Sequence, residues 1–520
     1  MPITGAILET AAQCPDRVAI AGSGGAAALD EVRGHERLTY AELVADSARM
    51  FAVIDALHRG QTEPPTPAPE TGGIAVTAVS ADSAFLAGRI VAGLAGFRAV
   101  SAVIDPRWPL AHRVDVILTT GIGVVISAAD DLEPALRARG WGGTVIAPME
   151  FARLVRLTDL QQDAPQPTVR DGDEAFLLLF SSGTTSNPKA FVKTRAQYRA
   201  NLAVSTAHLA PLPGVVTLAP GPVSYSLTLY AVIECMATGG SVHLADQFDA
   251  FGLASRVIAE GITRVVAVPA VVQGIAVAAR RNPQAFAGLE LVVTGGANLP
   301  ASIRTALAAS VPGARLISYY GAAEIGFIGD SREGDGTRVS LYGGVQASVR
   351  DTDSGAPVPE GEPGTLWIHA AACSLGYVAG TTAERLVGDD GWATVHDQAR
   401  IIDGQLELLG RAGDIAITGG HKVSLLEVER AFEATGDQAE AAAVCAVALP
   451  HPTLGSVIGL VVEGEAPSRD ALRAHAEAHL APQFVPTRWY RMNQLPRTVS
   501  GKIRRGETCD LVIAGEAERL

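Results

Sequence analysis

The chain has 520 residues, of which 48% are hydrophobic and 18% are charged, and its formal net charge is −14. This composition is typical of a globular protein and excludes a disordered chain, while the negative charge argues against broad binding to nucleic-acid phosphates. The length predicts two or more domains. Five dispersed cysteines without a CxxC pair argue against a disulfide framework and a structural zinc site.

No targeting or membrane signal is evident in the sequence. The first residues lack the basic region and apolar stretch of a signal peptide, and no uninterrupted apolar run reaches membrane-spanning length. We therefore expect a cytoplasmic enzyme that has neither a membrane nor a nucleic acid as its partner.

Short runs rich in Val, Ile and Leu alternate with longer alanine- and arginine-rich stretches through the first part of the chain. This alternation predicts an α/β fold with mainly parallel sheets. Helices are expected near 85–97 and 194–208. The expected strands are 73–79, 121–126, 143–146, 175–180, 215–218, 264–268 and 289–293.

The pattern changes after residue 365. Residues 365–410 carry short alternating runs and turn signals, which predict a small β-rich subdomain. Beyond them we expect helices at 425–434 and 468–480 and strands at 442–448 and 457–462. The sequence thus predicts a large N-terminal domain, 1–410, and a small mobile α+β C-terminal domain, 411–520, with the boundary at 410–414, where two glycines leave the backbone free.

Lysine is rare in this chain. Only four of its 41 basic residues are lysine, namely Lys189, Lys193, Lys422 and Lys502. A compact ammonium group suits a phosphate or a transferring oxygen, so each position is a candidate site. An arginine-rich composition explains the scarcity of lysine, but it does not explain why three of the four lie in stretches marked by Gly, Ser or Pro. Lys193 does not, and we expect its side chain to be solvated.

The stretch 181–189, SSGTTSNPK, lies between an expected strand and an expected helix. A loop of small and hydroxyl residues at a strand exit can direct backbone N–H groups and hydroxyls at phosphate. Pro188 and Ala190 do not fit a GxxxxGK[ST] P-loop, which needs glycine before the lysine and Ser or Thr after it. Taken alone, such a stretch is more often an ordinary loop.

This loop resembles the phosphate loop of the adenylate-forming superfamily, which includes acyl-CoA ligases, luciferases and the adenylation domains of peptide synthetases. The likeness continues in chain order from about residue 35 to 505. The other stretches that carry it are LTYAEL at 38–43, Asp105-Pro106 with Pro109 and Arg113, TGGA at 294–297, YGAAE at 320–324, Asp397, Gly410-Arg411 and LPRTVSGK at 495–502.

The resemblance implies the residues that bind ATP and Mg²⁺. The phosphates would be held by Ser181, Ser182, Gly183, Thr184, Thr185 and Lys189. The adenine would be lined by Gly295, Gly296, Ala297, Tyr319, Tyr320 and Gly321. Asp397 and Arg411 would bind the ribose, and Glu324 would be catalytic by holding Mg²⁺, although a helix-start carboxylate and a turn aspartate are the alternatives for Glu324 and Asp397.

The resemblance also implies two orientations of the C-terminal domain, one for each half-reaction. In the first, Lys502 would stabilise the acid's carboxylate and the α-phosphate. In the second, the face around Lys422 would serve the pantetheine thiol of CoA, with Gly419 and Gly420 leaving room for its arm. Gly413 stands at the hinge position. His421 is interpreted as a surface or hinge residue, and Arg504 and Arg505 as exposed charges.

The acid itself is indicated by the stretch 222–227, where amino-acid-activating members place an aspartate and this chain has none. Tyr225 falls where CoA ligases carry an aromatic gate, and Tyr230 and Ala322 would line the acid pocket. We expect an ATP-dependent ligase that converts an apolar carboxylic acid, including a bulky or aromatic one, to its CoA ester. Loading of a carrier protein and a non-catalytic nucleotide-binding homologue are the alternatives. Ala323, where the motif usually has threonine, predicts slow adenylation.

Overall fold

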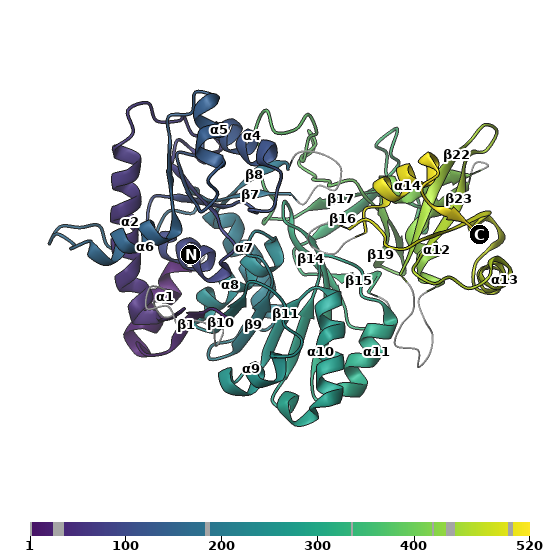
Figure 1. The fold of residues 1–520 in the computed structure, drawn as a ribbon, viewed down its shortest axis with the longest axis horizontal. Helices are drawn as coiled ribbons and strands as arrows, with labels where there is room; N and C mark the ends of the chain where they lie inside the picture. The colour runs from purple at the N-terminus through teal and green to yellow at the C-terminus, as the bar shows by residue number, and fades with distance from the viewer. Residues whose placement is uncertain are drawn as a thin grey trace.

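The computed structural model describes residues 3–23, 36–181, 188–333, 336–418, 421–432, 443–497 and 503–520. Their strands form three sheets, with helices packed on them (Figure 1). The predicted mixed α/β fold is confirmed. Within these residues, no helix combines the length and the apolar character needed to cross a membrane.

The first sheet has six strands in the order β6-β5-β3-β4-β7-β8, and its pairs are parallel except for β7 with β8. The central strands are buried on both faces, as is usual for parallel strands covered by helices. The strands are β3 (Val76–Ser80), β4 (Val100–Val103), β5 (Val124–Ser127), β6 (Thr144–Ile146), β7 (Ala175–Phe180) and β8 (Ala190–Thr194). The helices of this region are α3 (Ala84–Leu94), α4 (Leu110–Thr120), α5 (Leu132–Ala138) and α6 (Pro148–Leu157).

The second sheet has thirteen strands in the order β16-β17-β18-β19-β15-β14-β13-β12-β11-β9-β10-β1-β2. Parallel pairing joins β13 through β1, whereas β13 to β19 pair antiparallel and contain the expected β-rich subdomain. The strands are β1 (Val18–Ala21), β2 (Arg37–Thr39), β9 (Val216–Pro220), β10 (Ser241–Ala245), β11 (Arg264–Ala267), β12 (Leu291–Thr294), β13 (Arg315–Ala322), β14 (Gly326–Ser331), β15 (Arg338–Leu341), β16 (Gln346–Arg350), β17 (Gly364–His369), β18 (Asp397–Ile402) and β19 (Gln405–Arg411).

Seven further helices belong to this part of the chain. They are α1 (Thr4–Gln13), α2 (Tyr40–Arg59), α7 (Arg195–His208), α8 (Ser226–Thr238), α9 (Leu253–Glu260), α10 (Pro269–Arg281) and α11 (Ala301–Ser310). Short 3₁₀ helices lie at Pro69–Thr71, Pro283–Phe286, Ala412–Asp414 and Pro482–Phe484.

The third sheet contains only strands that follow Arg411, and Figure 1 shows it at the end of the molecule opposite α2. Its order is β21-β20-β23-β24-β25, with β22 also paired to β23. The strands are β20 (Ile415–Thr418), β21 (His421–Ser424), β22 (Val444–His451), β23 (Gly455–Glu463), β24 (Arg488–Met492) and β25 (Glu518–Arg519), and the helices are α12 (Leu425–Arg430), α13 (Arg469–His479) and α14 (Arg505–Ala514).

Most expected elements are present with ends shifted by a few residues, but β8 was not expected. It is a short strand that runs directly into α7, and the sequence showed only the helix. A capping box fixes this junction, because the Thr194 hydroxyl accepts from Gln197 N–H and the Gln197 side chain accepts from Thr194 N–H. The first turn of α7 is thereby held against the end of β8.

The two boundary glycines are not equivalent, and this difference can be tested. Gly410 has φ +111°, and a Cβ there would lie 2.7 Å from Leu426 Cδ1, whereas a Cβ at Gly413 would have no neighbour within 4 Å. We expect Gly410→Ala to lower the free energy of unfolding by about 1–3 kcal/mol and Gly413→Ala to leave it unchanged or raise it by up to about 1 kcal/mol. Urea unfolding of both variants measures this. Equal effects would contradict the assignment of strain to Gly410.

Candidate active site

The predicted phosphate loop connects β7 to β8, and its two ends are bonded to each other. Ser181 N–H donates to the Lys189 carbonyl at 2.9 Å, and Lys189 N–H donates to Ser181 Oγ at 3.3 Å. These bonds place both ends of the loop at the edge of the six-stranded sheet. The predictions for Ser182, Gly183, Thr184 and Thr185 fall outside the described residues.

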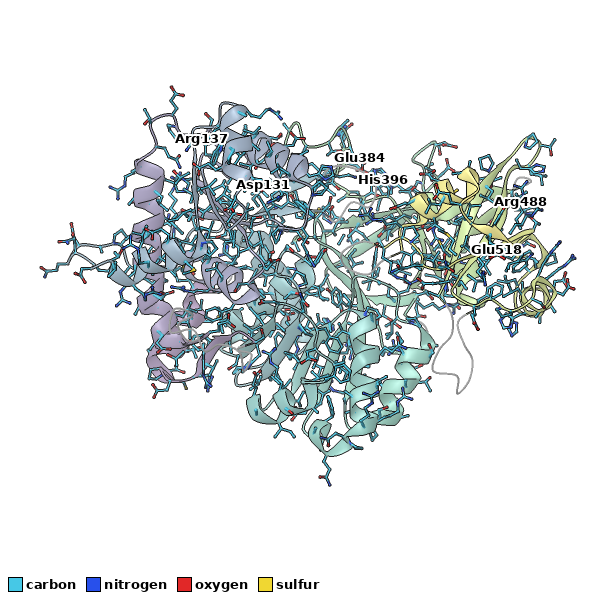
Figure 2. All side chains as sticks on the ribbon, in the orientation of Figure 1. Asp131, Arg137, Glu384, His396, Arg488 and Glu518 are labelled. Atoms are coloured by element: carbon cyan, nitrogen blue, oxygen red, sulfur yellow. The ribbon has the colours of Figure 1, made fainter. Side chains whose placement is uncertain are left out.

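The side chain of Lys189 lies among groups from the 377–396 region. Its ammonium forms an ion pair with Glu384 and lies 5.6 Å from the centre of the Tyr377 ring. Glu384 also lies 3.8 Å from His396 Nε2, and Figure 2 shows these two side chains close together. Lys189 therefore already contacts an anion at the position where the prediction places phosphate.

Glu324 occupies the turn between β13 and β14 and is only 7% exposed. Its Oε1 accepts a hydrogen bond from the Tyr377 hydroxyl at 3.2 Å. Burial raises the pKa of this carboxyl, while Arg411, Tyr377 and Lys193 act in the opposite direction. Such a group favours a cation that would compensate its buried charge.

The site fits a Mg²⁺ ion that is coordinated by the protein and by the nucleotide together. Among the described residues, no cluster of three or more His, Cys, Asp or Glu side chains could hold a metal ion alone. Mg²⁺ is commonly bound by one or two carboxylates together with substrate phosphates. The single buried carboxylate of Glu324 is consistent with that mode.

The predicted ribose ligands are neighbours across two strands. Asp397 begins β18 and pairs in register with Arg411 at the end of β19, and Arg411 Nε lies 3.5 Å from Asp397 Oδ1. The Tyr320 hydroxyl donates to Asp397 Oδ2 at 2.6 Å. The structure therefore brings together Asp397, Tyr320, which is 77 positions earlier in the chain, and Arg411, which is 14 positions later.

The predicted adenine segment runs past the ends of β12 and β13. A Cβ at Gly295 would lie 2.4 Å from the Tyr319 ring, and one at Gly321 would lie 2.5 Å from the Gly326 carbonyl oxygen. Gly296 has φ +78°, which favours glycine, and Gly296 and Ala297 are exposed. Close packing explains the first two glycines without reference to a ligand.

A pocket adjoins this segment. It contains about 600 Å³ of space outside the protein atoms, including the part open to solvent. Predicted residues Tyr230, Gly296, Tyr319, Gly321 and Ala322 lie in its wall. The wall also contains Lys193 and Ala323, for which the sequence did not predict a place in the pocket. Its other residues were not singled out, namely Leu179, Gln197, Tyr198, Asn201, Ser226, Leu227, Gly326 and Phe327.

The predicted gate residue Tyr225 is not among the residues that line this pocket. It precedes α8, and its ring lies 6.0 Å from the Arg107 guanidinium. Asp105 accepts two hydrogen bonds from the Arg107 side chain, at 2.8 Å each. Tyr225 thus lies beside the 105–113 motif.

The expectation that Lys193 is solvated was wrong. Its side chain, on β8, is only 4% exposed, and its ammonium donates to the Glu324 carbonyl at 2.7 Å and to the Ala372 carbonyl. Burial lowers the pKa of Lys193 to about 8. The spacing in the chain could not reveal this, because both acceptors lie more than 130 residues away.

The residues predicted for the thiol step are only partly described. The backbone of Lys422 pairs with that of Ile417 where β21 lies beside β20. Gly419, Gly420 and Lys502 fall outside the described residues.

The expectation that Arg505 is an exposed charge was also wrong. Its side chain is 16% exposed and binds the carboxylates of Asp414, at 2.7 Å, and Glu429. Asp414 Oδ2 also accepts from Arg411 N–H at 3.0 Å. Burial alone would lower the pKa of Arg505, but the two carboxylates outweigh it and raise the pKa. Arg504 is exposed as expected, with a surface contact to Glu507.

Comparisons with known proteins identify the fold and the family. ATP-bound MatB from Rhodopseudomonas palustris has the same fold: it superposes with a TM-score of 0.82 and 20% identity, covering 98% of this chain and 99% of that one. The AMP-binding enzyme family matches residues 73–378, and its C-terminal domain matches residues 427–502. The chain belongs to the AMP-binding enzyme family.

Two relatives align with most of the chain at low sequence identity. An uncharacterised acyl-CoA ligase, YhfT, of Bacillus subtilis is 26% identical over 80% of this chain and 84% of its own length. A feruloyl-CoA synthase of an Amycolatopsis species is 28% identical over 70% of this chain and 76% of its own length.

The part-buried Arg505 cluster predicts a large effect of one substitution. Arg505→Met would leave the Asp414 and Glu429 carboxylates without their shared cation, so we expect it to lower the free energy of unfolding by about 2–4 kcal/mol. Arg504→Met removes an exposed surface pair and is the matched control, with an expected loss under about 1 kcal/mol. Denaturant titration followed by circular dichroism compares the two. Similar losses would rule out a special role for Arg505.

Proposed function

We propose that the protein is an AMP-forming acid–thiol ligase. It activates a carboxylic acid with ATP to an acyl adenylate, with release of pyrophosphate, and then transfers the acyl group to the thiol of CoA. One observation carries the proposal: the segment 319–324 lines the pocket with Tyr319, Ala322 and Ala323 and then carries the buried Glu324 carboxylate. An acid in the pocket and a nucleotide at Glu324 would therefore meet at the same strand.

In the adenylation step, the acid's carboxylate attacks the α-phosphate of ATP and pyrophosphate leaves. Lys189, at the end of the 181–189 loop, would bind the phosphates, exchanging its Glu384 partner for them. Lys502 would approach both reacting anions and stabilise the developing charge. Glu324 would hold Mg²⁺, which supplies charge neutralisation at the phosphates when bound.

The nucleoside would be held by the groups already paired around the two strand ends. Asp397 has a carboxylate near Arg411 and Tyr320, and hydroxyl groups of a ribose are suitable donors to it. The residues 295–297 and 319–321 would face the adenine. Gly296 and Ala297 are exposed and carry little or no side chain, which leaves their backbone accessible to a flat ring.

In the thioester step, the face formed by Gly419, Gly420 and Lys422 would receive the pantetheine arm of CoA. Reaching it would require residues 415–520 to rotate relative to the rest, and Gly413, where an added Cβ would have no neighbour within 4 Å, is the proposed hinge. We propose domains 1–410 and 411–520, and the change of sheet between Arg411 and Ile415 supports a boundary near this position.

We propose an aromatic carboxylic acid as the substrate. Tyr198 and Tyr230 stack with ring centres 6.0 Å apart, and the edge-on contacts of Phe327 with Tyr230 and with Tyr319 are 4.6 and 4.7 Å. Flat walls of this kind favour a flat ligand. The name of the feruloyl-CoA synthase relative supports the same class of acid.

Pyrophosphate release with a panel of carboxylic acids tests the activity. The panel is run with CoA and, separately, with a phosphopantetheinylated carrier protein. We expect aromatic acids to be preferred over straight-chain acids and CoA to accept the acyl group. Acylation of the carrier alone would favour a loading enzyme, and the absence of pyrophosphate release with every acid would favour a non-catalytic nucleotide-binding protein.

The role of Lys502 gives a sharper prediction. Lys502→Ala should lower adenylate formation by at least about a hundredfold, because the charge that stabilises the transition state is lost. The same variant should still convert supplied acyl adenylate and CoA to thioester at close to the wild-type rate. Pyrophosphate exchange and thioester formation are measured separately. Equal loss in both half-reactions would contradict a role confined to adenylation.

A further inference from the structure

Three residues of the pocket wall carry hydrogen-bond donors that the protein pairs only in part. Lys193, Gln197 and Asn201 all line the pocket. Gln197 and Asn201 are four residues apart on α7 and so lie on the same face of that helix, whereas Lys193 is on β8, just before it. These three pocket-lining side chains are called the donor wall below.

The orientation of the two amides is fixed by backbone donors. Gln197 Oε1 accepts from Thr194 N–H at 2.9 Å, and Asn201 Oδ1 accepts from Phe327 N–H at 2.8 Å. The oxygens of both amides are thus engaged, and each leaves its NH₂ group as the available end. No acceptor for either NH₂ group is found among the residues described in the structure.

The charge of Lys193 points to the kind of acceptor. Its ammonium has three donors, and two of them bind the Glu324 and Ala372 carbonyls. Within the described part of the chain, no carboxylate lies within 4.0 Å of this nitrogen. The Glu324 carboxyl acts on Lys193 from farther away and raises its pKa against the effect of burial. A ligand anion at the donor wall would pair with this buried charge directly.

Other residues that line the pocket limit the shape of the ligand. The rings of Tyr198, Tyr230 and Phe327 are apolar and flat, and the side chains of Ala322 and Ala323 are small. The pocket thus combines a flat apolar slot with one polar wall. A purely apolar acid would leave the donor wall unpaired, at a cost for each buried donor.

We infer that the donor wall is a specificity site for an oxygen-containing, anionic substituent, and that the substrate is an aromatic acid carrying a second carboxylate, or an equivalent anion, away from the carboxyl group that is activated. This inference rests on the proposed function for the identity of the reaction. The inference about binding is independent of the proposed function, because the protein alone forms the donor wall and the apolar slot. It also replaces the expectation of an apolar acid with a more polar one.

Substituted benzoates of similar shape separate the contributions. The meta- and para-substituted carboxy-, nitro- and isopropyl-benzoates offer an anionic acceptor, a neutral acceptor and an apolar group. Calorimetric titration of each compound into the whole protein should rank carboxy above nitro and nitro above isopropyl. The carboxy compound should bind at least about tenfold more tightly than the isopropyl compound, as is typical for hydrogen bonds to a charged group.

Two variants test the donor wall itself. Lys193→Met keeps the length of the side chain without its charge, and Asn201→Asp keeps the acceptor for Phe327 N–H but replaces the NH₂ group with oxygen. Each should weaken binding of the carboxy compound by about tenfold or more and change that of the isopropyl compound by less than about threefold. Asn282→Asp, an exposed site at the end of α10, adds the same charge elsewhere and should change neither.

The outcomes are distinct. A wild-type protein that binds the isopropyl compound as well as the carboxy compound overturns the inference, and so does a loss in Lys193→Met and Asn201→Asp that is equal for all compounds. Thermal unfolding shows whether Lys193→Met is folded. If this variant is unfolded, binding to Asn201→Asp alone tests the donor wall. Pyrophosphate release is measured in parallel: selective binding without release would refute the ligase and leave the specificity site standing.

Discussion

A single buried ammonium joins the two large sheets at the site. Lys193 belongs to β8 of the six-stranded sheet, whereas its two acceptors, the carbonyls of Glu324 and Ala372, follow β13 and β17 of the thirteen-stranded sheet. A buried charge must keep its hydrogen bonds, because desolvation without them is costly. The turn that carries the Glu324 carboxylate and the loop that leads to Tyr377 are therefore held to the strand that follows the 181–189 loop. Backbone contacts of β8 with Tyr377 and Val378, and the bond from the Ser374 hydroxyl to the Val192 carbonyl, act beside this link, so β8 positions these segments as a whole.

The predictable part of the site consists of residues whose chemistry is local. The alternation of short apolar runs with helical stretches was sufficient for the α/β class, and the ordered motifs placed Asp397 and Arg411 in roles that their pairing across β18 and β19 makes physically reasonable. Gly295 and Gly321 stand where a side chain would collide with Tyr319 or with backbone. Such constraints act over a few residues and leave a mark in the sequence.

The rest of the site depends on contacts between distant segments. Lys193 is buried by segments 131 and 179 residues away, and Arg505 by carboxylates 91 and 76 residues away. Burial of a charged side chain against the usual tendency is not encoded in its own neighbourhood. The order of the thirteen-stranded sheet, in which β1 lies beside β10 and β15 beside β19, has the same origin. Gln197 and Asn201 could have been noticed from their spacing after Lys193, but only the structure shows which ends of their amides are occupied.

The connection between the last two sheets has a mechanical consequence. Arg411 is fixed to Asp397 by strand pairing, and Asp414 is fixed to α14 by Arg505, so only Ala412 and Gly413 lie between two anchored residues. Since each residue contributes two soft backbone dihedrals, turning residues 415–520 would have to be taken up by very few torsions, and it would break the Arg411 N–H bond to Asp414. A joint of this kind would allow rotation but little translation. Its motion would be a rotation about a nearly fixed point, and the distance that any group travels would grow with its separation from that point.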